Sequence, residues 1–412
     1  MKQYGSAFAV LLPGGVRTFL TDPFDYPRFF HTKELTFRDP ADALGMRVFG
    51  YDMRLYSPEV QDGLLAAIHT DLKGEALNAI TERMNKVLLE RLDAAVNQDW
   101  MYDSLFRFLN EHVFAAGTEA LFGEGSYSQE LHRSYSILDR HFQLLMAGVP
   151  ARAIPGVKSA QNHIADMLSV KREQQSVMMQ KRTTLVSDLG LSPREANKIN
   201  SPLIWAAQAN TIATAFWTVL LVLRDPEARA QILAEINNVQ GDTGVLSHEM
   251  LRKMVKLDSA INEVTRLMSM PLTIREATVD LEFELASGER LIVRKGEKLF
   301  PYPRVTHLDP EIYPDPHVFK FDRFLATDGP KHFFKNGQRV AFCLLPFGGG
   351  QSMCPGRFFA RNEFKIVVAT LLSAFDVELQ SAVVPELMLS RVGLGVPPPQ
   401  HDVPFRLRRR PR

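Results

Sequence analysis

The segment of residues 203–223 contains no charged side chain and is long enough to span a bilayer as a helix. Five polar side chains nevertheless occur in it: Gln208, Asn210, Thr211, Thr214 and Thr218. Such side chains are costly in lipid unless partners satisfy them. The segment also ends abruptly, because Asp225 and Pro226 follow directly. It therefore predicts a long helix buried in the middle of a globular protein.

The composition is that of a globular protein, with 412 residues of which 45% are hydrophobic and 23% charged. Because 48 Lys and Arg residues balance 47 Asp and Glu residues, no nucleic-acid partner is expected. A basic block at the C-terminus is interpreted as a solvated tail: Arg406, Arg408, Arg409, Arg410 and Arg412. Only Cys343 and Cys354 are present, which excludes a disulfide scaffold and a four-cysteine zinc site and suits a reducing compartment.

Periodicity divides the chain into a helical part and a more irregular part. Apolar residues recur at helical spacing through residues 57–268, where Ser247 is a suitable N-cap for one helix continuing to Val264. Residues 281–285 and 290–293 flank a Ser-Gly turn and predict a β-hairpin, as do residues 7–12 and 16–20. Residues 358–375 return to helix. We find no linker and no repeat, so we expect one domain, 1–412, mainly α with a small β-sheet region.

The chemistry concentrates in residues 346–357. Three consecutive glycines let the backbone approach a flat partner closely, since no side chains intervene. Cys354 then precedes Pro355, and proline favours the first position of a helix. Free N–H groups at a helix start stabilise a thiolate, which can serve as an axial ligand of haem iron. The alternative is a glycine turn before an ordinary helix with a buried cysteine. A nucleotide-binding loop lacks support, because no GxxxxGK[ST] pattern is present.

This stretch resembles the haem-binding loop of the cytochrome P450 family, a Phe-Gly-x-Gly-x-x-x-Cys-x-Gly pattern. Every fixed position of the pattern is matched, by Phe347, Gly348, Gly350, Cys354 and Gly356. The resemblance implies the cytochrome P450 fold, haem b as the cofactor, these five residues around it, and Cys354 as the iron ligand. Cys343 is then interpreted as a small buried apolar residue.

Two further motifs of the family follow in the expected order. Glu263 and Arg266 match its Glu-x-x-Arg helix, and Arg323 matches its later Arg-Phe element. The resemblance implies that these three side chains form a buried ionic network beneath the haem. Glu and Arg three residues apart share one helix face, and the planar guanidinium suits a buried carboxylate.

Within the family, the chain looks most similar to the branch of sterol 7α-hydroxylases, sterol 12α-hydroxylase and prostacyclin synthase. The similarity lies in residues 205–210 with Phe216 and Trp217, in residues 307–313 and in residues 390–395. Members of this branch usually carry an N-terminal membrane anchor, whereas this chain begins at what would be their first hairpin. We expect a cytoplasmic, soluble protein without a transmembrane anchor in this chain, or a membrane-associated parent if the N-terminus is truncated.

Two departures from the family bear on the site. Many members place Arg or His two residues before the cysteine, where this chain has Ser352, so Arg275 is expected to contact the haem propionates instead. The acid–alcohol pair that usually helps to deliver protons is replaced by Ala209 and Asn210. We expect Asn210 to hold a water beside the bound oxygen. The alternatives are a bond to a substrate oxygen and a purely structural bond to a neighbouring carbonyl across a helix kink.

The resemblance implies a monooxygenase that hydroxylates an apolar substrate, a sterol or another lipid, with O₂ and electrons from a redox partner. The partner would be a ferredoxin with its reductase or a flavoprotein reductase, docking at Arg357, Arg361 and Lys365. Residues 142–146 would line an access channel or, alternatively, belong to the core. Two other functions stay open: a haem-thiolate peroxide isomerase resembling prostacyclin synthase, and a non-enzymatic haem sensor.

Overall fold

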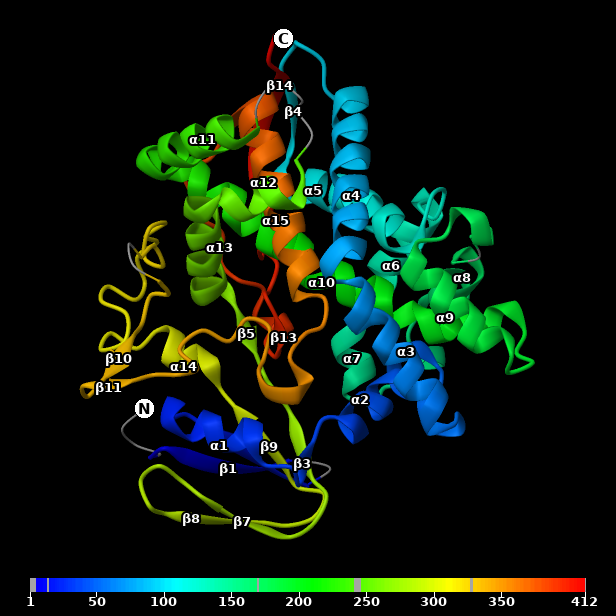
Figure 1. The fold of residues 1–412 in the computed structure, drawn as a ribbon, viewed down its shortest axis with the longest axis vertical. Coiled ribbons are helices and arrows are strands. Elements are labelled where there is room, and N and C mark those ends of the chain that lie inside the picture. The colour runs from blue at the N-terminus through cyan, green and yellow to red at the C-terminus, as the bar shows by residue number, and fades with distance from the viewer. Residues whose placement is uncertain (1–4, 13–14, 169, 241–245, 327–328, 412) are drawn as a thin grey trace.

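A long helix, α10, runs through the middle of the molecule from Pro193 to Arg224 (Figure 1). In this computed structural model, the described residues are 5–12, 15–168, 170–240, 246–326 and 329–411. Ser192 caps α10 by accepting a bond from the Glu195 N–H, while the Glu195 carboxylate accepts from the Ser192 N–H. Among the described residues, α10 is the one helix long and apolar enough to cross a membrane, and 72% of its most apolar window is buried inside the fold.

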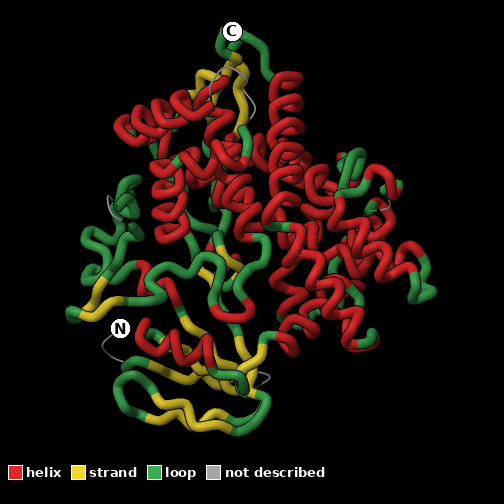
Figure 2. Tube along the Cα trace, in the orientation of Figure 1, coloured by secondary structure: helices red, strands yellow, loops and turns green. Residues whose placement is uncertain are grey.

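The other helices carry most of the core, and only some of them pack directly against α10 (Figure 2). They are α1 (Tyr26–His31), α2 (Arg38–Leu44), α3 (Pro58–Asp71), α4 (Gly74–Ala95), α5 (Leu105–Phe122), α6 (Gln129–Arg140), α7 (Phe142–Met146), α8 (Val157–Met167), α9 (Val177–Ser187), α11 (Pro226–Gln240), α12 (His248–Lys253), α13 (Val255–Met268), α14 (Pro303–His307) and α15 (Arg357–Ala374). One continuous apolar cluster joins residues from Val48 to Leu407.

The prediction of one continuous helix after Ser247 is wrong, because the segment forms two helices. Ser247 does cap α12, accepting from the Met250 N–H at 3.2 Å. The backbone then leaves the helical conformation at Met254, and α13 begins at Val255. The carboxylate of Glu235 on α11 accepts from the N–H groups of Lys256 and Leu257 at 2.8 and 3.0 Å. A side chain distant in sequence thus satisfies the free donors that a second helix start creates.

Strands gather mainly in a small sheet beside the N-terminus (Figures 1 and 2). That sheet has the order β1-β2-β9-β6-β3, with β2 and β9 parallel and the other pairs antiparallel. The strands are β1 (Ala7–Leu12), β2 (Gly15–Leu20), β3 (Leu35–Thr36), β4 (Met101–Ser104), β5 (Met270–Pro271), β6 (Arg275–Ala277), β7 (Leu281–Glu284), β8 (Arg290–Val293), β9 (Lys298–Pro301), β10 (Phe334–Lys335), β11 (Gln338–Arg339), β12 (Phe375–Leu379), β13 (Leu394–Gly395) and β14 (Pro404–Arg409). Both predicted hairpins, β1–β2 and β7–β8, are confirmed.

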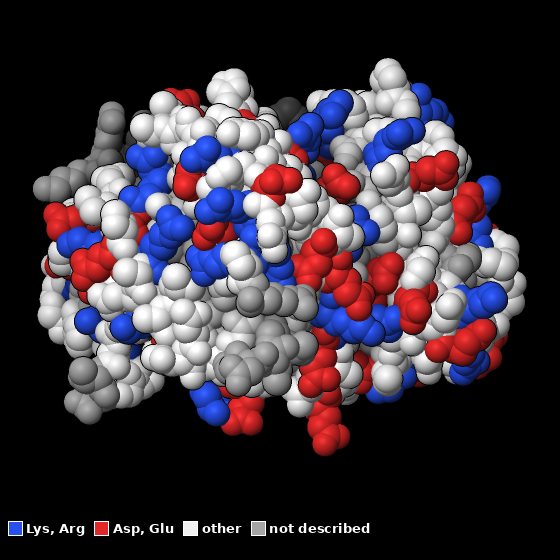
Figure 3. All heavy atoms as spheres, turned by 90° about the horizontal axis from the view of Figure 1, so that it is seen from above, with Lys and Arg blue, Asp and Glu red and all other residues white. Residues whose placement is uncertain are grey.

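The basic C-terminal block is not the solvated tail that the sequence suggested. Arg406 and Arg408 lie on β14, which pairs with β12 and β4, and they form ion pairs with Glu378 and Asp376. Arg409 and Arg410 likewise pair with acidic side chains, and Arg412 lies outside the described residues. Seen from this end of the molecule, cationic and anionic side chains are interspersed (Figure 3). The acids that neutralise the block lie on other strands and helices, which a local charge count does not reveal.

Candidate haem-thiolate site

Cys354 lies in a tight loop immediately before α15. Its backbone N–H donates to the carbonyl of Phe347 at 2.9 Å, and Met353 N–H donates to the carbonyl of Gly350 at 3.2 Å. Gly348 and Gly350 have φ values of 69° and 66°, which favour glycine. The guanidinium of Arg361 lies 5.5 Å from the Phe347 ring centre. These contacts fix the loop and place the half-buried thiol at its end.

The backbone of Gly349 and Gly350 lies close against one aromatic residue, Phe30. A Cβ at Gly349 would come 2.9 Å from the Phe30 ring, and a Cβ at Gly350 would come 2.8 Å from the Phe30 carbonyl oxygen. Phe30 belongs to α1 and packs tilted against Phe342 at 4.8 Å between ring centres. The flat partner expected for these two glycines is therefore, in part, this aromatic side chain.

The electrostatics of the thiol also differ from the sequence prediction. Pro355 is not the first helical residue, since α15 begins at Arg357 with Gly356 as its N-cap. Burial raises the pKa of the Cys354 thiol, and the N–H groups of Gly356 and Arg357 with the Arg357 charge lower it only in part. The helix start alone therefore does not create a thiolate. Coordination to a metal would do so, because a coordinating thiol is deprotonated.

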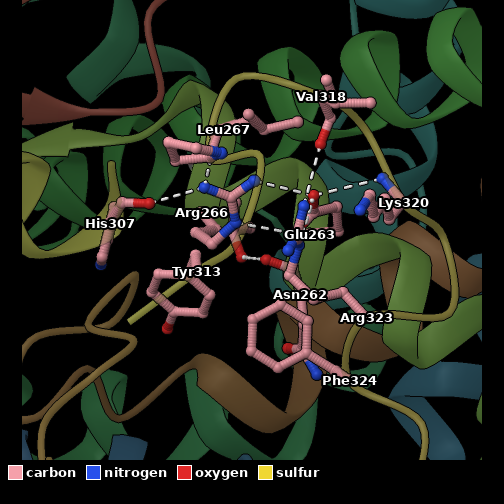
Figure 4. A network of polar contacts seen from close by, with 12 residues as sticks. Asn262, Glu263, Arg266, Leu267, His307, Tyr313, Val318, Lys320, Arg323 and Phe324 are labelled. Atoms are coloured by element: carbon pink, nitrogen blue, oxygen red, sulfur yellow. Dashed lines mark hydrogen bonds and ion pairs between the residues drawn. The ribbon is translucent and has the colours of Figure 1, made fainter. Parts of the chain in front are cut away.

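The structure brings Glu263, Arg266 and Arg323 together in a buried network (Figure 4). Arg266 donates to both Glu263 carboxylate oxygens, at 2.7 and 2.8 Å. Arg323 Nε lies 3.0 Å from each of the same oxygens. The side chains of Glu263 and Arg266 are fully buried, and that of Arg323 is 7% exposed. Nη1 of Arg266 and both Nη atoms of Arg323 bind backbone carbonyls, so the burial of these charges is compensated.

His307 extends this network and was not predicted as a site residue. Its carbonyl accepts from Arg266 Nη1 at 2.6 Å, and its ring Nε2 accepts from the Leu345 N–H at 3.2 Å. The ring is fully buried, and burial together with the charges of Arg266 and Arg304 lowers its pKa to about 3. The imidazole is therefore neutral at physiological pH. It belongs to the segment 307–313 that supports the branch resemblance, which is the signal that could have revealed it.

Arg275 is a buried cation without a carboxylate partner among the described residues. Its guanidinium donates to the carbonyls of Ile274 and Gly349, at 2.8 and 3.3 Å, and lies between the rings of Phe29 and Phe37. Burial lowers its pKa to about 10, so it stays charged at neutral pH. It lines a hollow of about 430 Å³ that also includes Ser352. A buried cation beside such a hollow suits an anionic group of a ligand.

The middle of α10 carries a less buried stripe formed by Ala206, Ala209 and Asn210. Asn210 Oδ1 accepts from the Val396 N–H at 2.8 Å. A Cβ at Gly395, whose φ is 114°, would collide with the same amide. The amide oxygen is thus engaged by the backbone next to β13. This bond to an N–H group distant in sequence differs from the structural alternative, which was a bond to a neighbouring carbonyl across a helix kink. Among the described residues no hydrogen bond engages the amide nitrogen, which is left for any further role.

The access-channel segment 142–146 forms α7, and its residues divide by burial. Phe142 and Leu145 are fully buried, whereas Leu144 and Met146 are 47% and 40% exposed. Phe142 stacks on Trp205 of α10 with 3.7 Å between ring centres. Its buried half is therefore core that covers α10, and only the outer half could meet an entering ligand.

The predicted docking patch on α15 is wrong for Lys365, which is buried, while Arg361 is half-buried and already paired. Lys365 is 6% exposed and lies 3.0 Å from Asp258 of α13, which also pairs with Arg361 at 3.2 Å. Burial alone would raise the pKa of the Asp258 carboxyl group. Lys365 and Arg361 nevertheless hold this pKa below its ordinary value. The groove there, about 730 Å³, is also lined by three exposed cations without acidic partners in the described chain: Lys73, Arg252 and Lys331.

Fold and site together define a helix-rich protein with a cysteine loop suited to a metal-bearing prosthetic group. Within the described residues no cluster of three or more His, Cys, Asp or Glu side chains could hold a bare metal ion. The family model of cytochrome P450 matches residues 58–405. The chain therefore belongs to the cytochrome P450 family and is a haem-iron monooxygenase of that family.

Individual relatives agree with this assignment. Cytochrome P450 7A1 of Sus scrofa is 31% identical over 98% of this chain and 87% of its own length. The 5-beta-cholestane-3-alpha,7-alpha-diol 12-alpha-hydroxylase of Sus scrofa is 31% identical over 99% and 87%. Cytochrome P450 7B1 of Mus musculus is 31% identical over 98% and 84%. The structure of retinoic-acid-bound cyanobacterial CYP120A1 superposes with a TM-score of 0.77 at 21% identity, covering 99% of this chain and 93% of that one, which confirms the fold.

Proposed function

We propose that this monooxygenase hydroxylates a sterol or a closely related apolar lipid. The observation that carries the proposal is similarity over 99% of this chain to a relative named as a 5-beta-cholestane-3-alpha,7-alpha-diol 12-alpha-hydroxylase. The substrate would lie against the stripe of Ala206, Ala209 and Asn210 on α10. Two small side chains and one amide leave room for a rigid apolar molecule and one polar contact.

The residues of the site fit haem b. Cys354 would hold the iron, and Phe347 with Gly348, Gly350 and Gly356 would shape the loop around it. When bound, the haem iron activates O₂ for insertion of one oxygen atom into the substrate. Arg275 would hold the propionates, since no carboxylate among the described residues pairs with its buried charge. The Glu263 network would anchor the loop from below through His307 and Leu345.

Electrons would come from a ferredoxin with its reductase or from a flavoprotein reductase. The groove beside α12 and α15 offers cations to an acidic partner and an apolar contact at Phe358, which is 41% exposed. Lys73 and Arg252 would attract the partner, whereas Arg361 and Lys365 share the single carboxylate of Asp258.

Two variants test the ligand assignment. Cys354→Ala should abolish the thiolate-type spectrum of the ferrous–CO complex. Cys343→Ala should retain it, because Cys343 packs in a separate apolar cluster with Tyr313 and Phe333. Loss of that spectrum in the Cys343 variant alone would overturn the assignment.

Substrate class is tested by absorbance changes of the purified holoenzyme with sterols, fatty acids and hydroperoxides. We expect sterols to give the tightest response and donor-dependent hydroxylated product. Conversion of hydroperoxides without an electron donor, with no donor-dependent product from any lipid, would instead establish the isomerase. Haem binding with neither activity would establish the sensor.

A further inference from the structure

Asp139, near the end of α6, binds two side chains that are distant from it in sequence. Its carboxylate oxygen Oδ1 accepts from Trp205 Nε1 of α10 at 2.8 Å and from Arg391 Nη2 at 2.7 Å. Nη1 of Arg391 also donates to the backbone carbonyl of Asp139, at 2.7 Å. The side chain of Arg391 is 8% exposed and that of Asp139 is 27% exposed. One acidic residue therefore connects α6, α10 and the segment that contains Arg391.

This contact has little freedom to move. Phe142, three residues after Asp139, stacks on the Trp205 indole with 3.7 Å between ring centres. The indole is therefore held on its face by Phe142 and at its N–H group by Asp139. Two charge-assisted bonds to one residue, largely shielded from solvent, are stronger than those of an exposed ion pair. The guanidinium of Arg391 thus has a fixed position relative to α10.

Arg391 begins a strap, residues 391–396, that is bound to α10 at both of its ends. At the first end, Arg391 is joined to Trp205 through Asp139. At the other end, the Val396 N–H donates to Asn210 Oδ1 at 2.8 Å. The strap therefore lies beside the part of α10 that carries the stripe of small and polar side chains.

The middle of the strap is held from the opposite side by β5, which pairs with β13 (Figure 1). The Gly393 N–H donates to the Met270 carbonyl at 2.9 Å. Gly393 and Gly395 have φ values of 96° and 114°, which favour glycine. A Cβ on Gly393 would press on Leu272, and a Cβ on Gly395 would collide with Asn210. The strap is therefore packed closely between β5 and α10, and a shift at Arg391 is expected to reach Asn210.

We propose that Arg391 is a positioning residue that determines which carbon of the substrate is hydroxylated. Its bonds to Asp139 fix the strap, and the strap holds Asn210 through the Val396 N–H. A rigid apolar molecule against the α10 stripe then has one preferred orientation. Without the ion pair the strap can shift, and the substrate can take several orientations, because small displacements of a bound molecule change its reactivity. The proposal rests on the proposed function, and Arg391 itself touches no reacting atom.

The distribution of hydroxylated products from one sterol tests the positioning. Arg391→Gln and Asp139→Asn should each increase the share of minor positional isomers several-fold, whereas haem content and total turnover change much less. Arg391→Lys should restore the wild-type distribution in part, because an ammonium can still bind the Asp139 carboxylate. The double variant Asp139→Asn/Arg391→Gln should be no less selective than either single variant, since the contact is already lost.

Arg194→Gln is the matched control, because Arg194 pairs with Asp166 at the exposed start of α10. Its product distribution should stay that of wild type. If Arg391→Gln does not load haem, Asp139→Asn carries the test. A wild-type product distribution in a haem-loaded variant of the pair, or additive effects in the double variant, would overturn the proposal.

Binding of azoles to the haem iron tests the strap without turnover. Imidazole is too small to reach along the strap, so it should bind wild type and Arg391→Gln equally. A rigid biphenyl-substituted imidazole should dissociate several-fold faster from Arg391→Gln, because the displaced strap packs less closely against it. Equal dissociation rates would contradict the proposal even in a sterol hydroxylase. Absence of donor-dependent hydroxylated product in wild type would contradict the proposed function, and the azole result would still decide the role of the strap.

Discussion

The imidazole of His307 accepts a hydrogen bond from the backbone N–H of Leu345 at 3.2 Å, two residues before the cysteine loop begins at Phe347. The carbonyl of the same residue accepts from Arg266. His307 therefore connects the buried ionic network to the loop segment that leads to Cys354. A disturbance on either side of this histidine is expected to reach the other.

The first prediction concerns that link. His307→Leu leaves the buried Leu345 N–H without an acceptor, which should cost about 1–3 kcal/mol of unfolding free energy. The thiolate-type fraction of the ferrous–CO spectrum should fall with it, and His307→Gln should restore both in part. A His307→Leu variant with wild-type melting and a wild-type spectrum would show that the hydrogen bond between His307 and Leu345 does not stabilise the fold or the cysteine loop.

The same histidine predicts a pH dependence. Its folded-state pKa, about 3, lies below its unfolded value, so the unfolded chain binds the extra proton below about pH 6.5. Its contribution to stability is therefore complete above that pH and falls as the pH drops toward 3. Urea unfolding at pH 7 and pH 5 should show a smaller loss for His307→Gln than for wild type. Equal losses would assign the acid sensitivity to other groups.

The second prediction concerns the ionic network. Arg266→Ala leaves the carboxylate of Glu263 buried with one partner fewer, at a cost of about 3–5 kcal/mol. We expect poorly folded, haem-poor protein, measured by haem content and by thermal unfolding. Arg290→Ala is a suitable control, because its pair with Glu282 is exposed and its loss should matter little. Normal haem content in the Arg266 variant would refute the proposed role.

The sequence predicts those parts of the fold and site that depend on local patterns. The hairpins β1–β2 and β7–β8, the helix α10 and the motif residues around Cys354 all follow from spacing or from contiguous motifs. The predictions that fail concern residues whose partners are distant in sequence. Asp258 pairs with Lys365, more than a hundred residues further along the chain. The carboxylate of Glu235, on α11, accepts hydrogen bonds from the first N–H groups of α13. Neither pairing leaves a periodic signal in the chain.

A third prediction concerns Arg275. Removing the buried charge of Arg275 should weaken haem retention, because the expected bidentate bond between its guanidinium and a haem propionate carboxylate would be lost. Arg275→Ala should release haem to apomyoglobin at least about tenfold faster, equivalent to about 1.4 kcal/mol. Arg28→Ala is the comparison, since that arginine is half-exposed and pairs with Glu284 on the surface. Unchanged haem release would leave Arg275 with a structural role only, through its bonds to the Ile274 and Gly349 carbonyls and its contacts to the nearby rings.

A fourth prediction separates the cations of the docking groove. Reversing Lys73 and Arg252 to glutamate should slow reduction by an acidic partner on the order of tenfold at low ionic strength and weaken its salt dependence. Lys365→Glu should instead destabilise the fold, since it would set a buried carboxylate beside Asp258. Stopped-flow reduction at two salt concentrations measures the first effect and thermal unfolding the second. Unaltered reduction kinetics in the double variant would remove the groove from electron delivery.

The last prediction concerns Asn210, whose two amide atoms have different surroundings. The oxygen holds the Val396 N–H, and only the nitrogen is left to position a water or a substrate oxygen. Asn210→Leu removes both interactions. Gly395→Ala acts first on the backbone contact, because the new Cβ would collide with the amide oxygen, whereas it would lie 3.0 Å from the amide nitrogen, and the φ of 114° disfavours alanine.

We expect both variants to lose stability, and Gly395→Ala to lose more of it through backbone strain. Asn210→Leu alone should lower the product formed per donor consumed, with the difference recovered as hydrogen peroxide and excess water. The paired measurement is thermal unfolding and coupling in each variant with the same sterol. Equal coupling in the two variants would show that the amide is structural, since the only interaction that they lose in common is the one with Val396.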